Sequence, residues 1–205
     1  MRDKILEILP NDKHTFHELN YPEIHIVDWK DVDNTQGIKV YNEKQEEISS
    51  VCLFNSKELD VSIDAFGENA FPVSIGVQAR QCECVSFPSN FDQNSWILAI
   101  ETKYANNEEA AFRMREDDEN YPEKMVSQII STVEYLRGKG MIEEDRLVHA
   151  IISFPNLVSD FNSTLFSLVP EEYSIENLIV AKKIRIKGCN AANIISPKRI
   201  KLISD

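Results

Sequence analysis

Hydrophobic residues gather most densely in two short runs that flank a patterned helix. The segment Trp96–Tyr104 begins with five apolar residues, which is typical of a strand covered on both faces. Leu147–Phe154 is a second such run and is followed by Pro155. Between the runs, apolar residues recur at helical spacing and predict one buried face on a helix over 122–137, ended by Gly138 and Gly140 (Met125, Ile129, Val133 and Leu136). A helix between two buried strands usually connects a parallel pair, so residues 96–154 are expected to form a strand–helix–strand unit.

Weaker patterns predict the remaining elements. A short N-terminal helix ends at Pro10, and residues 23–42 read as two strands joined by a turn. Leu59, Ile63 and Phe66 are spaced like a helix face, which favours a short helix over 56–67, although Val61 and Ile63 also alternate as in a strand. Further strands are expected in the segments 48–54, 73–77, 81–87 and 179–186, where 73–87 forms two strands or one long bent strand.

These elements predict the fold class α/β, with a central mixed β-sheet flanked by helices. A chain of 205 residues is long enough to bury a core without disulfides, and we expect one domain over 1–205. Its core is expected at about 56–187, with the N-terminal hairpin region 1–55 as a candidate extension. Cys82 and Cys84 lack the spacing of common zinc sites and are expected to be small buried residues. The apolar runs are too short for a bilayer and no secretion signal is seen, so a cytoplasmic location is expected.

Charge is unevenly distributed along the chain, which bears on the partners to be expected. The net charge is −12, which argues against a general nucleic-acid coat. Residues 182–205, however, contain seven basic residues and one acidic residue, so this segment carries +6 and the remainder −18. Such a segment either faces a polyanion or forms solvated edge strands protected by lysines.

The end of the predicted strand 96–104 is where candidate chemistry enters. Glu101, Thr102 and Lys103 follow directly on its apolar residues, and Glu101 and Lys103 point to the same face. A buried unpaired charge is costly, so these groups are expected to pair with each other, meet water or hold an ion. The other interpretation is that the strand simply emerges into solvent there.

A second acidic residue, Glu83, lies inside the apolar segment 81–87. It precedes Glu101 by 18 positions, which is enough for two neighbouring strands joined by a loop. Two carboxylates on adjacent strands can bind Mg²⁺ through hard oxygen ligands. Lys103 beside them could orient a water molecule for attack on a phosphodiester, while the metal offsets the charge on the phosphate.

In this order of elements, the chain resembles the PD-(D/E)XK, or restriction-endonuclease-like, nuclease superfamily over about residues 73–154. In that family an acid on one strand is followed by an acid-x-Lys motif on the next, then a helix and a further strand. The resemblance implies Mg²⁺-dependent hydrolysis of nucleic acid, with Glu83 and Glu101 as metal ligands and Lys103 as the water-positioning residue. It leaves open Asp64 or Asp92 as the first acid, Glu58 or Glu68 as a further acid, and Gln128 as a polar residue facing the site.

The basic C-terminal segment would then contact the phosphate backbone through Lys182, Lys183, Arg185 and Lys187. The rival hypothesis is a non-enzymatic acidic interaction protein on a nuclease-like scaffold, because an acidic surface suits a basic protein partner. The two hypotheses differ in one structural expectation. The nuclease requires the two glutamates and Lys103 to share an open cleft.

Overall fold

The computed structural model describes residues 1–34, 37–113 and 120–203. Its central layer is a six-stranded sheet, called sheet A here, in the order β1-β5-β8-β9-β10-β11. The bounds of these strands are β1 His14–Leu19, β5 Val61–Phe66, β8 Cys84–Pro88, β9 Leu98–Thr102, β10 Val148–Ser153 and β11 Ile184–Gly188.

Sheet A combines antiparallel and parallel pairing. From β1 to β9 the strands pair antiparallel, and β9, β10 and β11 pair parallel. The expected strand–helix–strand unit is confirmed, because helix α4 (Tyr121–Gly138) connects β9 to β10. The side chain of Asn120 starts this helix by accepting a hydrogen bond from the backbone N–H of Glu123 at 2.8 Å.

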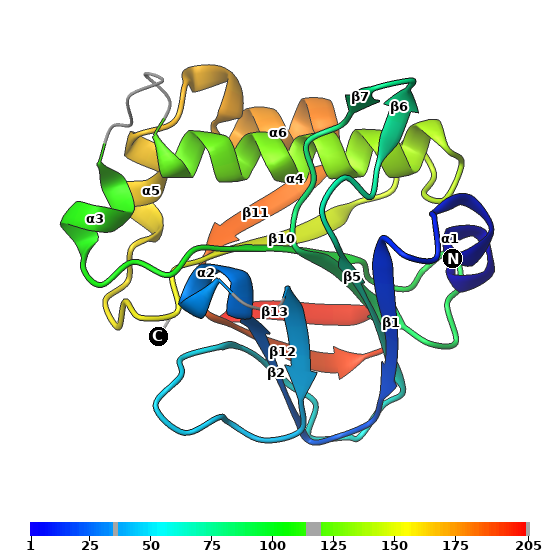
Figure 1. Ribbon diagram of the computed structural model, residues 1–205, viewed down its shortest axis with the longest axis horizontal. Helices are drawn as coiled ribbons and strands as arrows, with labels where there is room; N and C mark the ends of the chain where they lie inside the picture. Colours follow the sequence, from blue (N-terminus) through cyan, green and yellow to red (C-terminus); the bar gives the residue numbers. More distant parts are fainter. Residues whose placement is uncertain (35–36, 114–119, 204–205) are drawn as a thin grey trace.

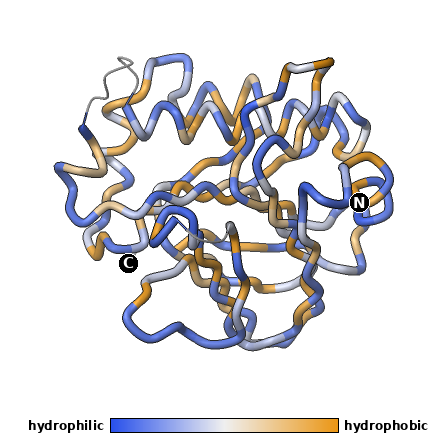
Figure 2. Tube along the Cα trace, in the orientation of Figure 1, coloured by the Kyte–Doolittle hydropathy of each residue, from blue (hydrophilic) through white to orange (hydrophobic). Residues whose placement is uncertain are grey.

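Two hydrophobic cores cover the two faces of sheet A. Helix α4 lies across one face, as Figure 1 shows, and buries the predicted residues Met125, Ile129, Val133 and Leu136. On this side lie also α1 (Arg2–Ile8), α5 (Asn162–Ser167) and α6 (Ile175–Lys182), each of which buries a leucine or isoleucine. Figure 2 shows orange residues alternating with blue ones along α4, in agreement with one buried face.

A second sheet packs on the opposite face and is called sheet B here. Its order is β13-β12-β4-β2-β3, with a second core between the two sheets. Its strands are β2 Glu23–Asp28, β3 Ile38–Tyr41, β4 Val51–Phe54, β12 Ala191–Ser196 and β13 Arg199–Ile203. The smaller elements are α2 Trp29–Asp33, β6 Pro72–Ser74, β7 Val77–Gln78, α3 Glu108–Phe112 and the 3-10 turn Glu171–Tyr173.

The fold class α/β with mixed sheets flanked by helices is therefore confirmed. So are the pairing of β2 with β3 and the burial of Cys82 and Cys84. Residues 1–55 contribute β1 to sheet A and β2, β3 and β4 to sheet B, so they share both cores with the rest of the chain. Among the described residues, no helix is both long and apolar enough to cross a bilayer.

Two predicted elements are wrong. The segment expected as a helix over 56–67 forms strand β5, whose six residues are all buried because β1 and β8 flank it and both faces are covered. The expected strand 179–186 is helical up to Lys182, where Lys183 adopts a left-handed conformation (φ 52°) and ends α6; the strand begins only at Ile184.

Candidate functional site

Two glutamates face each other across the central strands of sheet A. Glu101 lies on β9 and is 4% exposed, and Glu83 directly precedes β8 and is half-buried. The antiparallel register pairs Cys84 with Ile100, and the backbone N–H of Glu83 donates to the carbonyl of Ile100 at 3.0 Å. This register sets Glu83 opposite Glu101, on the side of the sheet that α4 covers.

A third carboxyl reaches the same place from sheet B. Asp28 ends β2, is 5% exposed and accepts a hydrogen bond from the backbone N–H of Lys30 at 3.0 Å, which starts α2. Asp28, Glu83 and Glu101 line one cleft of about 310 Å³ between α2 and α4. This acid was not among the predicted site residues. Its position after an apolar strand, like that of Glu101, is the sequence signal that could have indicated it.

Burial raises the pKa of all three carboxyls, and repulsion from neighbouring carboxylates raises the pKa of Glu83 and Glu101 further. The pKa of Glu83 rises to about 8, first through burial and then through the negative charge of Asp28. The pKa of Glu101 lies well above its ordinary value, because of burial first and then the charges of Glu83 and Asp28. Burial also raises the pKa of Asp28, against the opposing effects of the Lys30 backbone N–H and the Lys103 charge. The raised pKa values mean that the cleft favours protonated carboxyls unless a cation stabilises their ionised forms.

Glu101 also has a carboxyl oxygen without a partner. Its Oε2 is buried and accepts no hydrogen bond from any described residue. An orphaned buried oxygen costs stability, commonly about 1–3 kcal/mol, unless something else meets it. This atom belongs to a group that lines the cleft, so it marks a place for a cation or a donor.

Lys103 lies at the edge of the cleft and is positioned by its neighbours. Its backbone N–H donates to the carbonyl of Ser153 on β10 at 2.9 Å, and its ammonium contacts the carboxylate of Asp31 on α2. The same ammonium lies 5.6 Å from the centre of the Tyr121 ring, at the start of α4. The structure thus brings Glu83, Glu101 and Lys103 into one cleft.

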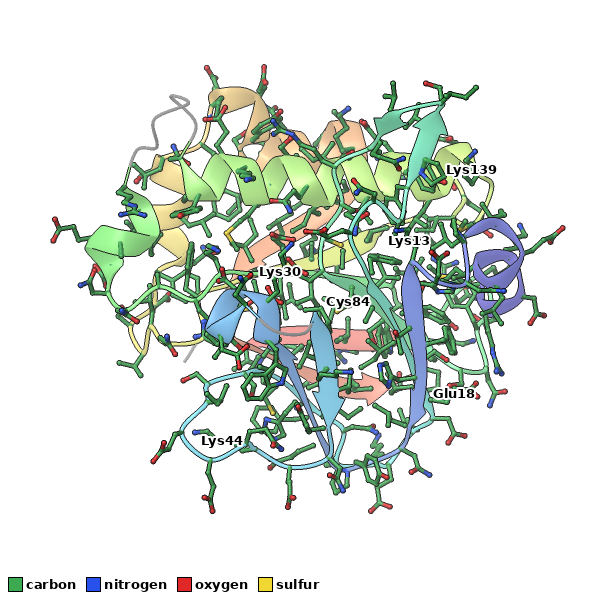
Figure 3. The ribbon with its side chains drawn as sticks, viewed as in Figure 1. Lys13, Glu18, Lys30, Lys44, Cys84 and Lys139 are labelled. Carbon is green, nitrogen blue, oxygen red and sulfur yellow. The ribbon has the colours of Figure 1, made fainter. Side chains whose placement is uncertain are left out.

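Helix α4 supplies the polar wall of the cleft. Gln128 lines it and donates from Nε2 to the carbonyl of Gln81 at 2.9 Å, so it bridges α4 to the segment that carries Glu83. Lys124, one turn earlier, also lines the cleft and favours the ionised form of Glu101. Figure 3 shows Lys30, which belongs to α2, in the space between α2 and α4. Three lysines therefore surround the three carboxyls (Lys30, Lys103 and Lys124).

A larger cavity of about 800 Å³ adjoins this cleft. The two share Asp28, Glu83, Lys30 and other lining residues, so they form one continuous depression. The cations Lys30, Arg80 and Lys124 line the larger cavity, next to the exposed Glu68, which contacts Lys30. This part of the depression combines positive side chains with space beside the acidic cleft.

The other predicted acids lie elsewhere or have other partners. Asp64 is fully buried on β5, where His14 bonds to it at 2.7 Å, and it does not line the cleft. Asp92 lies in the loop before β9, where its Oδ1 accepts the backbone N–H of Asn94 at 2.7 Å. Glu58 lies in a turn with φ 49°, and Glu68 lines the larger cavity only.

The four predicted basic residues do not form one group. Lys182 pairs with Glu134 at 2.5 Å and Lys183 ends α6. Only Arg185 and Lys187, both on β11, line a common groove, which is separate from the acidic cleft.

A further set of ligand-type residues lies on the strands of sheet B. Glu23, His25 and Cys52 have ligand atoms within 4.8 Å of one another, and among the described residues they form the one group of three that does so. His25 Nε2 lies 3.2 Å from Glu23, and its Nδ1 lies 2.9 Å from the Ser50 hydroxyl. The oxygens of Asp28, Glu83 and Glu101 are spaced more widely than this limit.

Comparison with known proteins adds no relative: no family model, curated protein or solved structure matches the chain. The chemistry of the cleft therefore has to be inferred from its own geometry.

Proposed function

We propose that the chain is a metal-dependent phosphodiesterase acting on nucleic acid, on a restriction-endonuclease-like core. One observation supports this above the others. The antiparallel strands β5, β8 and β9, the crossover helix α4 and the parallel strand β10 follow one another in the order expected for that superfamily. This order sets Glu83 opposite Glu101 and places Lys103 at the same strand end.

The donor set of the cleft suits a hard divalent cation such as Mg²⁺. Asp28, Glu83 and Glu101 offer carboxylate oxygens, and Glu101 Oε2 has no partner among the described residues. These three residues would hold the ion, after side-chain rotations that bring their oxygens within 4.8 Å of one another. Such an ion supplies positive charge to a phosphate and lowers the pKa of a nearby water molecule.

The remaining residues of the cleft have positioning roles in this proposal. Asp31 holds the ammonium of Lys103 beside the carboxyls, where it can orient the attacking water. Lys30, Arg80 and Lys124 line the adjoining cavity and would bind the phosphate oxygens of the substrate. A −12 chain can bind a polyanion only if such local cations outweigh its overall repulsion.

The decisive experiment is a cleavage assay on single- and double-stranded DNA and RNA with Mg²⁺, Mn²⁺ or EDTA. We expect cleavage that requires the metal and falls at least about a hundredfold in Glu101→Gln and in Lys103→Ala, because each removes a group from the cleft. Glu109→Gln is a matched control, since this glutamate is exposed on α3. It should cleave like the wild type.

Thermal unfolding gives a second readout that does not depend on finding the substrate. Mg²⁺ or Mn²⁺ should raise the Tm of the wild type and of Glu109→Gln, and should leave the Tm of Glu101→Gln nearly unchanged. Absence of metal-dependent cleavage together with equal metal effects on all three proteins would contradict the proposal. The acidic surface would then favour a non-enzymatic role with a basic protein partner.

A further inference from the structure

The edge strands of the two sheets form a groove with an unusual charge. Strand β11 ends sheet A, strand β13 ends sheet B, and a groove of about 620 Å³ lies between them. Five cationic side chains line it, and its lining includes no Asp or Glu among the residues that the structure describes (Arg185, Lys187, Lys198, Arg199 and Lys201). We call it the basic groove. In a chain with 34 acidic and 22 basic residues, this separation of charge calls for a physical reason.

The two strands present these cations because of their alternating patterns. On β11, Ile184 and Ile186 are buried toward the helices, and Arg185 and Lys187 point to the other face. On β13, Arg199 and Lys201 are exposed on either side of the buried Ile200. Charges at alternate positions of a strand repeat at about 6.6 Å, so each wall carries a regular row of positive charge.

Protection of edge strands explains these residues incompletely. Lysines on an edge strand discourage pairing with other chains. For that purpose the lysines do not need to lie near other cations. Here two edges bring their cations to one groove, where like charges repel. Among the described residues none of the five forms an ion pair within 4.0 Å. An anion in the groove would relieve the repulsion.

The floor of the groove indicates what kind of anion fits. Apolar residues line the groove together with the cations (Leu147, Ile175, Ile200 and Leu202). His149 on β10, opposite Arg185 in register, adds no positive charge at neutral pH, since burial and the charge of Arg185 lower its pKa to about 4. Rows of charge above apolar contacts suit a polymer with repeated phosphates and sugars better than a single small anion.

We propose that the basic groove binds the phosphate backbone of a nucleic acid strand, at a site separate from the acidic cleft. The choice of nucleic acid as the ligand rests on the proposed function, whereas the anion site itself rests on the groove alone. Strand β11 contributes Arg185 and Lys187 to the groove, the turn before β13 contributes Lys198, and β13 contributes Arg199 and Lys201.

The test measures binding in EDTA, so that cleavage plays no part. A labelled single-stranded DNA and its duplex are titrated by fluorescence anisotropy at several salt concentrations, with the wild type and three double variants. Arg185→Ala/Lys187→Ala and Arg199→Ala/Lys201→Ala should each weaken single-strand binding at least about tenfold. Each should also reduce the slope of log K against log salt by about 1.4, or 0.7 per lost phosphate contact. Lys39→Ala/Lys44→Ala, on β3 and the loop after it, is the matched control and should bind like the wild type.

Several outcomes would overturn the inference. It fails if both groove variants bind like the wild type, or if the control variant loses as much affinity as they do. It also fails if polyglutamate binds as tightly as DNA, because the ligand would then be any acidic polymer. All the substituted residues are exposed except the half-buried Lys187, and the melting curves of the three double variants should match that of the wild type.

The results separate this inference from the proposed function. Salt-dependent binding through the groove by a chain that never cleaves would support the groove and contradict the nuclease. Metal-dependent cleavage with unchanged binding by both groove variants would support the nuclease and contradict the groove.

Discussion

At the scale of single residues, buried ionisable groups divide into two kinds in this protein. Asp64 has a partner in His14 and lies away from the cleft. Glu101 has an orphaned oxygen and lies inside it. Both were candidates in the sequence, because both are acids within apolar segments. The sheet register, which sets Glu83 opposite Glu101, shows that Glu101 and not Asp64 shares a site with Glu83. Asp28 could not be placed with these residues from the sequence, since its position depends on the packing of sheet B against sheet A.

Asp64 leads to a prediction about pH. Burial raises its pKa to about 6, although the bond to His14 opposes this. The folded protein therefore holds this proton more tightly than the unfolded chain, so its contribution to stability is largest near pH 4 and is lost as the pH rises toward 6. The loss amounts to about 3 kcal/mol at most. Asp64→Asn should remove this dependence. The free energy of unfolding of the variant minus that of the wild type should therefore increase between pH 4.5 and pH 7.

Urea unfolding at the two pH values measures this difference. Asp60→Asn, at an exposed position before the same strand, is the control and should keep the wild-type pH dependence. If Asp64→Asn and the wild type changed in parallel between the two pH values, the carboxyl of Asp64 would have an ordinary pKa in the folded state.

At the scale of elements, the correct predictions are those in which the local sequence shows which faces of the element are buried. Helix α4 has a single buried face, and β9 and β10 are covered on both sides, so the local pattern of apolar residues predicted them. Strand β5 is also buried on both faces, but Leu59, Ile63 and Phe66 happen to fall at helical spacing. For β12 and β13 the sequence offered only the interpretation of residues 182–205 as solvated edge strands. Their bounds were not predicted, because the core that buries their apolar residues is built from distant parts of the chain.

Two glycines in different elements give a matched prediction. A Cβ on Gly188, at the end of β11, would lie 3.1 Å from the Cα of Asn162 and 3.2 Å from the Phe161 ring. Since backbone cannot move aside easily, Gly188→Ala should destabilise the protein by about 1–3 kcal/mol. A Cβ on Gly138, in the last turn of α4, meets nothing within 4 Å. Gly138→Ala should therefore stabilise the protein, by about 0.5–1 kcal/mol.

Chemical denaturation of both variants checks this pair. Equal effects of the two substitutions would show that α5 does not approach β11 as closely as the structure has it.

At the scale of the whole molecule, the first quarter of the chain is joined to both cores. Strand β1 pairs along the full length of β5, and β2, β3 and β4 form three of the five strands of sheet B. The cleft itself depends on this joining, because Asp28 and Asp31 come from the N-terminal region and Glu83, Glu101 and Lys103 from the central one. Sequence patterns indicated β2, β3 and β4 but not β1, and gave no sign of which sheet each strand would enter.

This arrangement predicts the behaviour of a truncated chain. Residues 56–205 alone would lack β1, which pairs with β5, and β4, which pairs with β12. Apolar residues of both cores would then be exposed, so we expect no cooperative unfolding transition by circular dichroism. The full chain should show one. A truncated chain that melted cooperatively would show instead that residues 1–55 are an extension of a self-sufficient core.

The acidic cleft has a consequence for how such a protein could change over generations. Each of its three carboxyls is held where it would be easier for the chain to carry a neutral residue. Replacing Glu83 or Glu101 with a neutral residue should stabilise the fold, whereas replacing Asp28 would also remove the cap of α2. In lineages where the proposed activity no longer matters, we expect Glu83 and Glu101 to be among the first residues to disappear while the scaffold persists.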